Sequence, residues 1–189
     1  MANRQSNGFK ASSESIANKI KCINSISAKK MLVGWTDGAK DNKGNSYAVI
    51  ARTLEYGRSA GVSSKGRKYP AIPPRDFVGQ FFSKFSNETK KQIRKALSEL
   101  HKKQNVTLSD IDIALKRVGV FGVGDLQKAI VNGDYQANAP ATIKSWLRNK
   151  SKSKIAKSVK ANPRLVPTMG KKPLIDTGSL VQHVTYKIV

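Results

Sequence analysis

The chain ends in KKPLIDTGSLVQHVTYKIV (171–189), which holds the most clearly patterned strand of the whole sequence. Apolar and polar residues alternate over HVTYKIV (183–189), as expected of a strand with one buried face. Ahead of it, Asp176 can accept backbone N–H bonds in an Asx turn and Gly178 can take a positive φ. We therefore expect the terminal strand to complete an antiparallel sheet, with Leu174 and Leu180 packing on either side of the turn.

A second strand is expected in KKMLVGWT (29–36), and the remaining patterned segments predict helices. One helix should begin after Ser12 or Ser13 and present Ile16, Ile20 and Ile23 on one apolar face. The lone cysteine, Cys22, lies among these isoleucines and is expected to be a small buried hydrophobic residue. A single cysteine also excludes an internal disulfide.

Further helices are predicted from capping residues and apolar stripes. The first of these helices is capped by Ser46 and stopped by Gly57, and a short helix with Phe77, Phe81 and Phe85 follows. A third helix is capped by Ser86 and carries the apolar stripe Ile93, Leu97 and Leu100. A fourth has Ser109 and Asp112 as a capping box and carries the apolar stripe Ile111, Ala114, Leu115 and Val118. The glycines of GVFGVGDLQKAIVNG (119–133) should break this last helix and restart it. Between the helices, residues 57–71 read as a long exposed loop.

These elements predict an α+β fold, with a small antiparallel sheet covered by helices. A single domain should comprise residues 13–146 and 172–189. Residues 1–12 should form a flexible N-terminal arm, and residues 147–171 a basic insertion.

Charge is the most unusual property of the chain. Its 189 residues include 35 Lys and Arg against 12 Asp and Glu, a net charge of +23. Residues 135–175 contain no acidic residue and ten basic ones: Lys144, Arg148, Lys150, Lys152, Lys154, Lys157, Lys160, Arg164, Lys171 and Lys172. Such a chain is expected to bind a polyanion or an acidic protein surface.

Patterns typical of catalysis or cofactor binding fail on inspection. GVSSKGRK (61–68) lacks the Gly-Lys-Ser/Thr of a phosphate-binding loop, and lysines interrupt the oxygen ligands that a calcium loop would need around Asp37 and Asp41. His101 and His183 lie far apart without neighbouring carboxylates. We expect no enzyme activity, no metal and no cofactor. No apolar run reaches the roughly 18 residues of a membrane span, and the start MANRQSNGFK lacks a signal peptide's apolar core, so synthesis in the cytoplasm is expected.

Four stretches, in this order, carry a resemblance: TLEYG (53–57), IPPRDF (72–77), NAPATIKSW (138–146) and KPLIDTGSL (172–180). Together they resemble the virion morphogenesis, or tail-completion, family of tailed bacteriophages, which includes the tail-completion protein of phage Mu. The residues that match its motifs or stand at motif positions are Glu55, Tyr56, Gly57, Pro73, Pro74, Arg75, Phe77, Thr142, Lys144, Pro173, Leu174, Asp176, Thr177, Gly178 and Leu180. Tyr56 stands where the family usually has Phe, Asp76 replaces the second Pro of its Pro-x-Arg-Pro-Phe, and the basic insertion has no counterpart.

The physical interpretation of these motifs is structural. Glu55 should accept hydrogen bonds from backbone N–H groups or pair with Arg75, whose guanidinium offers a fork for a carboxylate. Pro73 and Pro74 should stiffen the approach to the helix that follows.

The resemblance implies a structural protein of the phage neck, located in the virion at the top of the tail. Subunits would form a ring, as a hexamer, between the tail terminator or the tube and sheath proteins and the head-completion or connector protein. The expected partner or DNA contacts are Arg58, Lys65, Arg67, Lys68, Arg148, Lys150, Lys152, Lys154, Lys157 and Lys160. The positive charge fits either acidic neighbouring rings or nonspecific contact with phage DNA, and the sequence does not separate the two.

Three alternatives stay open, and the first two belong to other functional classes. A nonspecific nucleic-acid-binding protein is favoured by the net charge alone. A nuclease would need clustered carboxylates for its metal, which the basic regions lack. A neighbouring neck part, such as the tail terminator or a head-completion protein, would have a similar size and assembly role.

Overall fold

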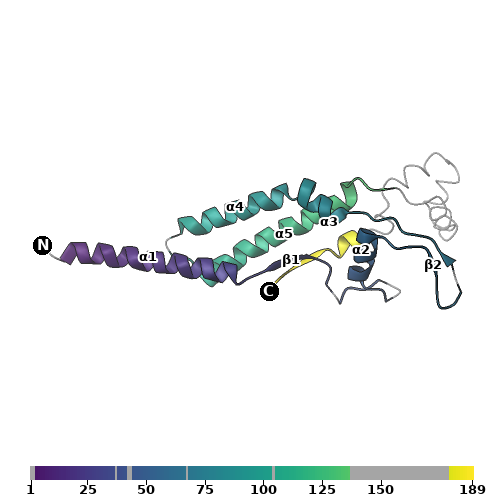
Figure 1. The fold of residues 1–189 in the computed structure, drawn as a ribbon. Helices are drawn as coiled ribbons and strands as arrows, with labels where there is room; N and C mark the ends of the chain where they lie inside the picture. The colour runs from purple at the N-terminus through teal and green to yellow at the C-terminus, as the bar shows by residue number, and fades with distance from the viewer. Residues whose placement is uncertain (1–2, 37, 42–43, 67, 104, 137–178) are drawn as a thin grey trace. The chain divides into compact units, whose positions relative to one another are not determined.

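The computed structural model describes residues 3–36, 38–41, 44–66, 68–103, 105–136 and 179–189, and of residues 3–14 the backbone alone (Figure 1). The chain divides into two compact units, one of Met1–Gly34, Ser86–Asp125 and Thr185–Val189, the other of Trp35–Phe85 and Leu126–Val184. Helices and small antiparallel sheets build both units, which confirms the predicted α+β class. The predicted single domain stays a prediction.

In the first unit, a two-stranded ribbon joins residues 31–34 to residues 185–188 near the C-terminus. Strand β1 (Met31–Gly34) pairs antiparallel with β4 (Thr185–Ile188), with Met31 opposite Ile188. The predicted terminal strand is thus confirmed. It begins at Thr185 rather than His183, because a helical turn, α9 (Ser179–Gln182), precedes it.

Helix α5 (Leu108–Asn132) packs against this ribbon and runs unbroken through its glycines, so the predicted break is wrong. A Cβ built at Gly119 would lie 2.5 Å from the Tyr186 ring, and one at Gly122 would lie 3.0 Å from Val33. The missing side chains let the helix backbone approach the strands. Contact with the ribbon offsets the conformational entropy that glycine loses in a helix.

Helix α4 (Asn87–Lys102) runs beside α5, with Ser86 at its N-cap as predicted (Figure 1). Buried Asp125 of α5 accepts hydrogen bonds from the backbone N and Oγ1 of Thr89, at 2.9 and 2.7 Å. This polar contact lies on the face of α4 that is turned toward α5. The buried face of α4 is not the predicted stripe, since two residues of that stripe, Ile93 and Leu97, are 39% and 49% exposed. The buried residues of α4 are Thr89, Gln92, Ala96 and Leu100.

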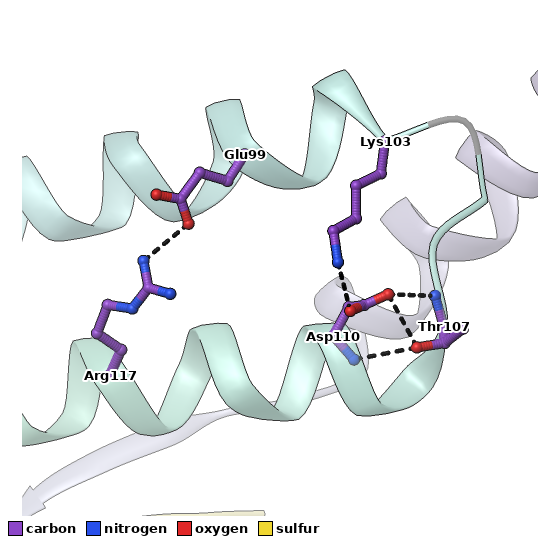
Figure 2. Close-up of polar contacts among 5 residues, drawn as sticks. All are labelled: Glu99, Lys103, Thr107, Asp110 and Arg117. Atoms are coloured by element: carbon purple, nitrogen blue, oxygen red, sulfur yellow. Dashed lines mark hydrogen bonds and ion pairs between the residues drawn. The ribbon is translucent and has the colours of Figure 1, made fainter.

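The start of α5 is held by a capping box made by Thr107 and Asp110, not by the predicted Ser109 and Asp112. Thr107 N donates to Asp110 Oδ2 at 3.0 Å, and Asp110 N donates to Thr107 Oγ1 at 3.2 Å. Lys103 Nζ adds an ion pair 2.6 Å from Asp110 Oδ1 (Figure 2). The box therefore lies two residues earlier than expected.

A second ion pair bridges α4 and α5. Arg117 Nη1 lies 2.7 Å from Glu99 Oε2 (Figure 2), and the bond with Arg117 lowers the pKa of Glu99. Both side chains are well exposed, so the pair contributes little to stability.

Helix α1 (Asn3–Ser27) includes residues 3–12, which we expected to form a flexible arm, and no proline interrupts it. Its isoleucine stripe points outward: Ile16, Ile20 and Ile23 are 57%, 53% and 62% exposed. The opposite face is half-buried and mixed in character, since it holds Asn18 and Ser25 together with Cys22 and Ile26. Asn18 Nδ2 donates to Asn105 Oδ1 at 3.1 Å. The three isoleucines thus share one apolar face of the helix, as predicted, and that face is exposed. Cys22, which we expected to be buried, is half-buried and lies away from the stripe, so that prediction is wrong.

The second unit begins at Trp35 and contains α2 (Tyr47–Tyr56), which has Ser46 at its N-cap and Gly57 at its C-cap as predicted. It also contains β2 (Gly61–Val62), β3 (Lys68–Tyr69) and α3 (Phe77–Gln80), and α3 continues into the π-helical turn η1 (Phe81–Phe85). The predicted phenylalanine helix is thus confirmed as α3 and η1. Strands β2 and β3 form an antiparallel hairpin inside the segment that we predicted as loop, so that prediction is wrong for these residues.

The core of the second unit is built around Phe77, which is fully buried. The Trp35 ring meets Phe77 edge-on with 5.8 Å between ring centres, and Trp35 Nε1 donates to the Leu180 carbonyl at 2.8 Å. His183 stacks on Tyr47 with 4.2 Å between ring centres. The Trp35 hydrogen bond thus joins α9 to the start of the unit, and the His183 stack joins the residue after α9 to α2.

Two glycines of α5 provide a matched test of helix–ribbon packing. Gly119→Ala should destabilise the protein by about 1–3 kcal/mol relative to Gly124→Ala, because its new Cβ overlaps the Tyr186 ring. Gly124→Ala meets nothing within 4 Å and should stabilise by about 0.5–1 kcal/mol. Urea unfolding measures both, and equal stabilisation by the two variants would contradict the packing.

The Asp110 carboxylate should make stability depend on acid pH. Bonds from Lys103 and then from Thr107 lower its pKa from 3.8 to about 2. Its contribution is therefore present above the unfolded pKa and is lost as the pH falls from about 4 to 2. Asp110→Asn should flatten the decline of unfolding free energy over this interval. Lys103→Gln should raise the carboxyl pKa measured by NMR, and an unchanged pKa would contradict the assignment.

Candidate functional site

The first two motif stretches meet in the second unit, where α2 ends. Gly57 takes φ 74°, and a Cβ there would lie 2.6 Å from the Ile72 carbonyl oxygen and 2.8 Å from Pro74 N. Only glycine allows both this backbone conformation and this close approach. The glycine that ends TLEYG is therefore the residue against which IPPRDF packs.

Backbone hydrogen bonds then join the two stretches side by side. Arg58 and Ile72 exchange N–H to carbonyl bonds of 2.8 and 2.7 Å, and Arg75 N donates to the carbonyls of Leu54 and Glu55 at 2.9 and 3.1 Å. These bonds use the polar backbone groups at the C-terminus of α2, which otherwise lack intrahelical partners. Residues 53–58 and 72–77 thus form one local structure.

Glu55 holds the beginning of the next helix. Its Oε2 accepts a hydrogen bond from Val78 N at 3.1 Å, which confirms the expected acceptor role toward backbone N–H. Asp76 caps α3, its Oδ1 accepting from Gly79 N at 2.9 Å. Burial raises the pKa of Glu55, the Asp76 carboxyl raises it further, and the Val78 bond partly opposes the shift. Asp76, which stands where the resembled motif has Pro, thus provides the cap of α3.

Arg75 is a structural residue in this arrangement, because only 3% of it is exposed. Burial lowers the pKa of its guanidinium. Half-buried Pro73 and exposed Pro74 lie beside it, and 75% of Tyr56 is exposed. Among the family-motif residues described here, Tyr56 is the large side chain that faces solvent.

Tyr135 is a residue that sequence reasoning missed. Its hydroxyl donates to the Ala129 carbonyl, and its pKa is raised first by burial and then by the negative charges of Glu55 and Asp76. Nearby, Gln80 and Asp134 exchange hydrogen bonds of 2.8 and 2.9 Å. These contacts bring the segment after α5 next to the motif residues, and no sequence spacing signals them.

The expected contact residues that the structure describes lie on or beside the hairpin. Arg58, Lys65 and Lys68 are all exposed, and the Arg58 guanidinium carbon lies 4.1 Å from the centre of the Tyr69 ring. We call the described residues 58–66 and 68–72 the basic hairpin. The structure therefore places these three exposed cations along one hairpin.

The other predicted site residues fall into two groups. Leu180 is buried in α9 and supplies the carbonyl that Trp35 binds. The predicted residues outside the described part of the chain are Arg67, Thr142, Lys144, Arg148, Lys150, Lys152, Lys154, Lys157, Lys160, Pro173, Leu174, Asp176, Thr177 and Gly178.

Substitutions of Glu55 test its role at the start of α3. Because burial raises its pKa, the folded protein should lose stability as pH rises above 4.5, the ordinary pKa of the group. Glu55→Gln keeps an acceptor oxygen and removes this charge, so it should gain stability relative to wild type between pH 4.5 and 8 in urea unfolding. Glu55→Ala should be about 1 kcal/mol less stable than Glu55→Gln, because the Val78 N–H loses its acceptor. If the wild type instead became more stable relative to Glu55→Gln as the pH rises, this assignment would be refuted.

Within the described residues, no three His, Cys, Asp or Glu side chains gather where they could hold a metal ion. No helix in that part of the chain is long and apolar enough to cross a membrane. Comparison with family models, curated proteins and solved structures found no match to this chain.

Proposed function

We propose that this chain is a structural protein of the neck of a tailed bacteriophage. It completes the tail and joins it to the head as one subunit of a ring, placed between the tail terminator or tube and the head-side connector. Binding energy and geometry, rather than catalysis, carry this function. The proposal begins from the four motif stretches, and two features of the structure support it.

The first supporting feature is the structural use of the motif residues. Glu55, Gly57, Arg75 and Phe77 come from two stretches separated in sequence, yet each helps to build one local arrangement around α3. Motif residues used in this way support a function that depends on shape and binding rather than on an active site.

The observation that carries the proposal is the outward face of α1. Its three isoleucines are more than half exposed, while its other side is half-buried and contacts the rest of its unit at Asn105. Full burial of an isoleucine stabilises by about 1.5–3 kcal/mol, so covering the stripe yields on the order of 3 kcal/mol. An apolar stripe on a strongly charged chain is typical of a subunit made for assembly.

A second candidate is a nonspecific nucleic-acid-binding protein with no place in a virion. The net charge of +23 and the exposed cations of the basic hairpin favour it. Deleting the gene distinguishes the two functions. Heads and tails should stay unjoined only if the protein has the neck function.

The experiment is deletion of the gene from the phage that carries it, followed by electron microscopy of the particles. Full heads and finished tails should accumulate separately, and wild-type protein supplied from a plasmid should restore joined particles. Normal joined particles after deletion would end the proposal.

Plasmid-borne variants of α1 then test the isoleucine stripe. Ile20→Glu should lower the yield of infectious particles at least about tenfold, since tenfold corresponds to only 1.4 kcal/mol of lost association. Ala17→Glu is the matched control, because Ala17 is exposed on the same helix, off the stripe, and receives the same charge. Circular dichroism of both purified variants verifies that they fold. Equal complementation by the two variants would show that the stripe has no role.

A further inference from the structure

The basic hairpin lies in a segment without negative charge. From Arg58 to Arg75 the chain has five basic residues and no acidic one. Arg75 is buried, whereas Arg58, Lys65 and Lys68 are exposed. No carboxylate within the segment neutralises these cations, so their combined field is directed at solvent.

The backbone of the hairpin spaces the three cations along a narrow ribbon. Strands β2 and β3 pair Gly61 with Tyr69 and Val62 with Lys68, and the Arg58–Ile72 bridge closes the base. At the tip, Gly66 N donates to the Ser63 carbonyl at 2.9 Å, and Gly66 has φ 70°. Arg58 therefore stands at the base, Lys68 on a strand and Lys65 in the turn.

This spacing suits a row of phosphates. Arg58 and Lys65 are seven residues apart in sequence, so a fully extended chain would separate their backbones by at most about 25 Å. Phosphates on one strand of duplex DNA follow one another every 3.4 Å along the axis. Each of the three cations can thus meet a different phosphate.

Arg58 is held in position by an aromatic ring. Its guanidinium carbon lies 4.1 Å from the centre of the Tyr69 ring, close enough for a cation–π contact. The Tyr69 ring in turn occupies the space of a missing side chain, because a Cβ at Gly61 would lie 2.5 Å from its hydroxyl oxygen. A guanidinium held in this way loses little conformational entropy when its N–H groups bind a phosphate.

The rest of the exposed surface also favours phosphate over protein. Ser59, Ser64 and Gly66 are exposed, and Val62 is the one large apolar side chain of the described hairpin that is strongly exposed. Protein interfaces have an apolar, aromatic-rich core depleted of lysine, whereas DNA backbone contacts come from Arg, Lys, Ser and backbone N–H groups.

We propose that the basic hairpin binds the phosphate backbone of double-stranded DNA without reading its sequence. The binding is a property of the isolated protein and does not depend on the neck function proposed above. Its failure in solution would therefore leave the phage experiment unaffected, and the reverse also holds.

The test compares two triple variants of the full chain that carry the same net charge. The hairpin variant is Arg58→Gln, Lys65→Gln and Lys68→Gln, and the control is Arg94→Gln, Lys95→Gln and Lys102→Gln on the exposed face of α4. Both retain the basic residues at 135–175, so their difference isolates the hairpin. Circular dichroism verifies that both variants fold.

Fluorescence anisotropy with a 25-base-pair duplex of arbitrary sequence measures affinity across a salt series. The slope of log affinity against log salt should become shallower by about 2.7 in the hairpin variant, at roughly 0.9 per lost phosphate contact, and affinity at 0.1 M salt should fall on the order of a hundredfold. The control should keep the wild-type slope. Tyr69→Leu, which removes no charge, should weaken binding about threefold through loss of the Arg58 stack.

Three results would overturn the proposal. If the wild-type protein does not bind the duplex at low salt, the hairpin is not a DNA-binding site. Equal losses in the two triple variants would mean that charge acts without a defined hairpin contact. Binding to poly-glutamate that matches duplex binding, and that the hairpin variant loses to the same extent, would assign the hairpin to an acidic protein surface instead.

Discussion

Pairing of β1 with β4 is the constraint on which the first unit depends. It brings residues 31–34 and 185–188 together from opposite ends of the sequence. The entropic cost of closing such a long loop grows only slowly with its length, so a short ribbon can be stable once a helix covers it. Helix α5 provides that cover where Gly119 meets Tyr186. The C-terminal strand therefore has to be present before this packing is complete.

The second unit depends on a comparable close approach, at Gly57. The backbone of residues 72–74 lies against this glycine, and the resulting alignment presents Glu55 to the first N–H groups of α3. Arg75, which by its chemistry could bind a partner, is buried in the same arrangement. Glu55, Gly57 and Arg75 thus determine the local fold of this region, whereas Tyr56 remains exposed.

Two exposed surfaces of different chemistry are left for partners. The α1 stripe is apolar and suits a protein neighbour, whereas the basic hairpin is cationic and suits phosphate. A protein at a head–tail junction would need both kinds of contact, one to hold its neighbours and one for the DNA that passes between them. Each surface is described within its own unit, and each proposal stands on its own observations.

Much of the local structure was determined by the sequence itself. The alternating terminal strand, the helix between Ser46 and Gly57, and the role of Glu55 as an acceptor for backbone N–H groups were all predicted. These features depend on neighbours in sequence or on the intrinsic chemistry of one side chain, which periodicity and capping patterns report directly.

Only the tertiary structure decided which faces are covered. Periodicity grouped Ile16, Ile20 and Ile23 on one side of a helix, but whether that side meets the protein depends on contacts distant in sequence. The structural role of a glycine cannot be read from the local sequence for the same reason. At Gly119 it permits contact with Tyr186 rather than breaking α5, and at Gly61 it makes room for the ring that positions Arg58. What stands opposite a residue is a property of the fold, so local sequence patterns do not report it.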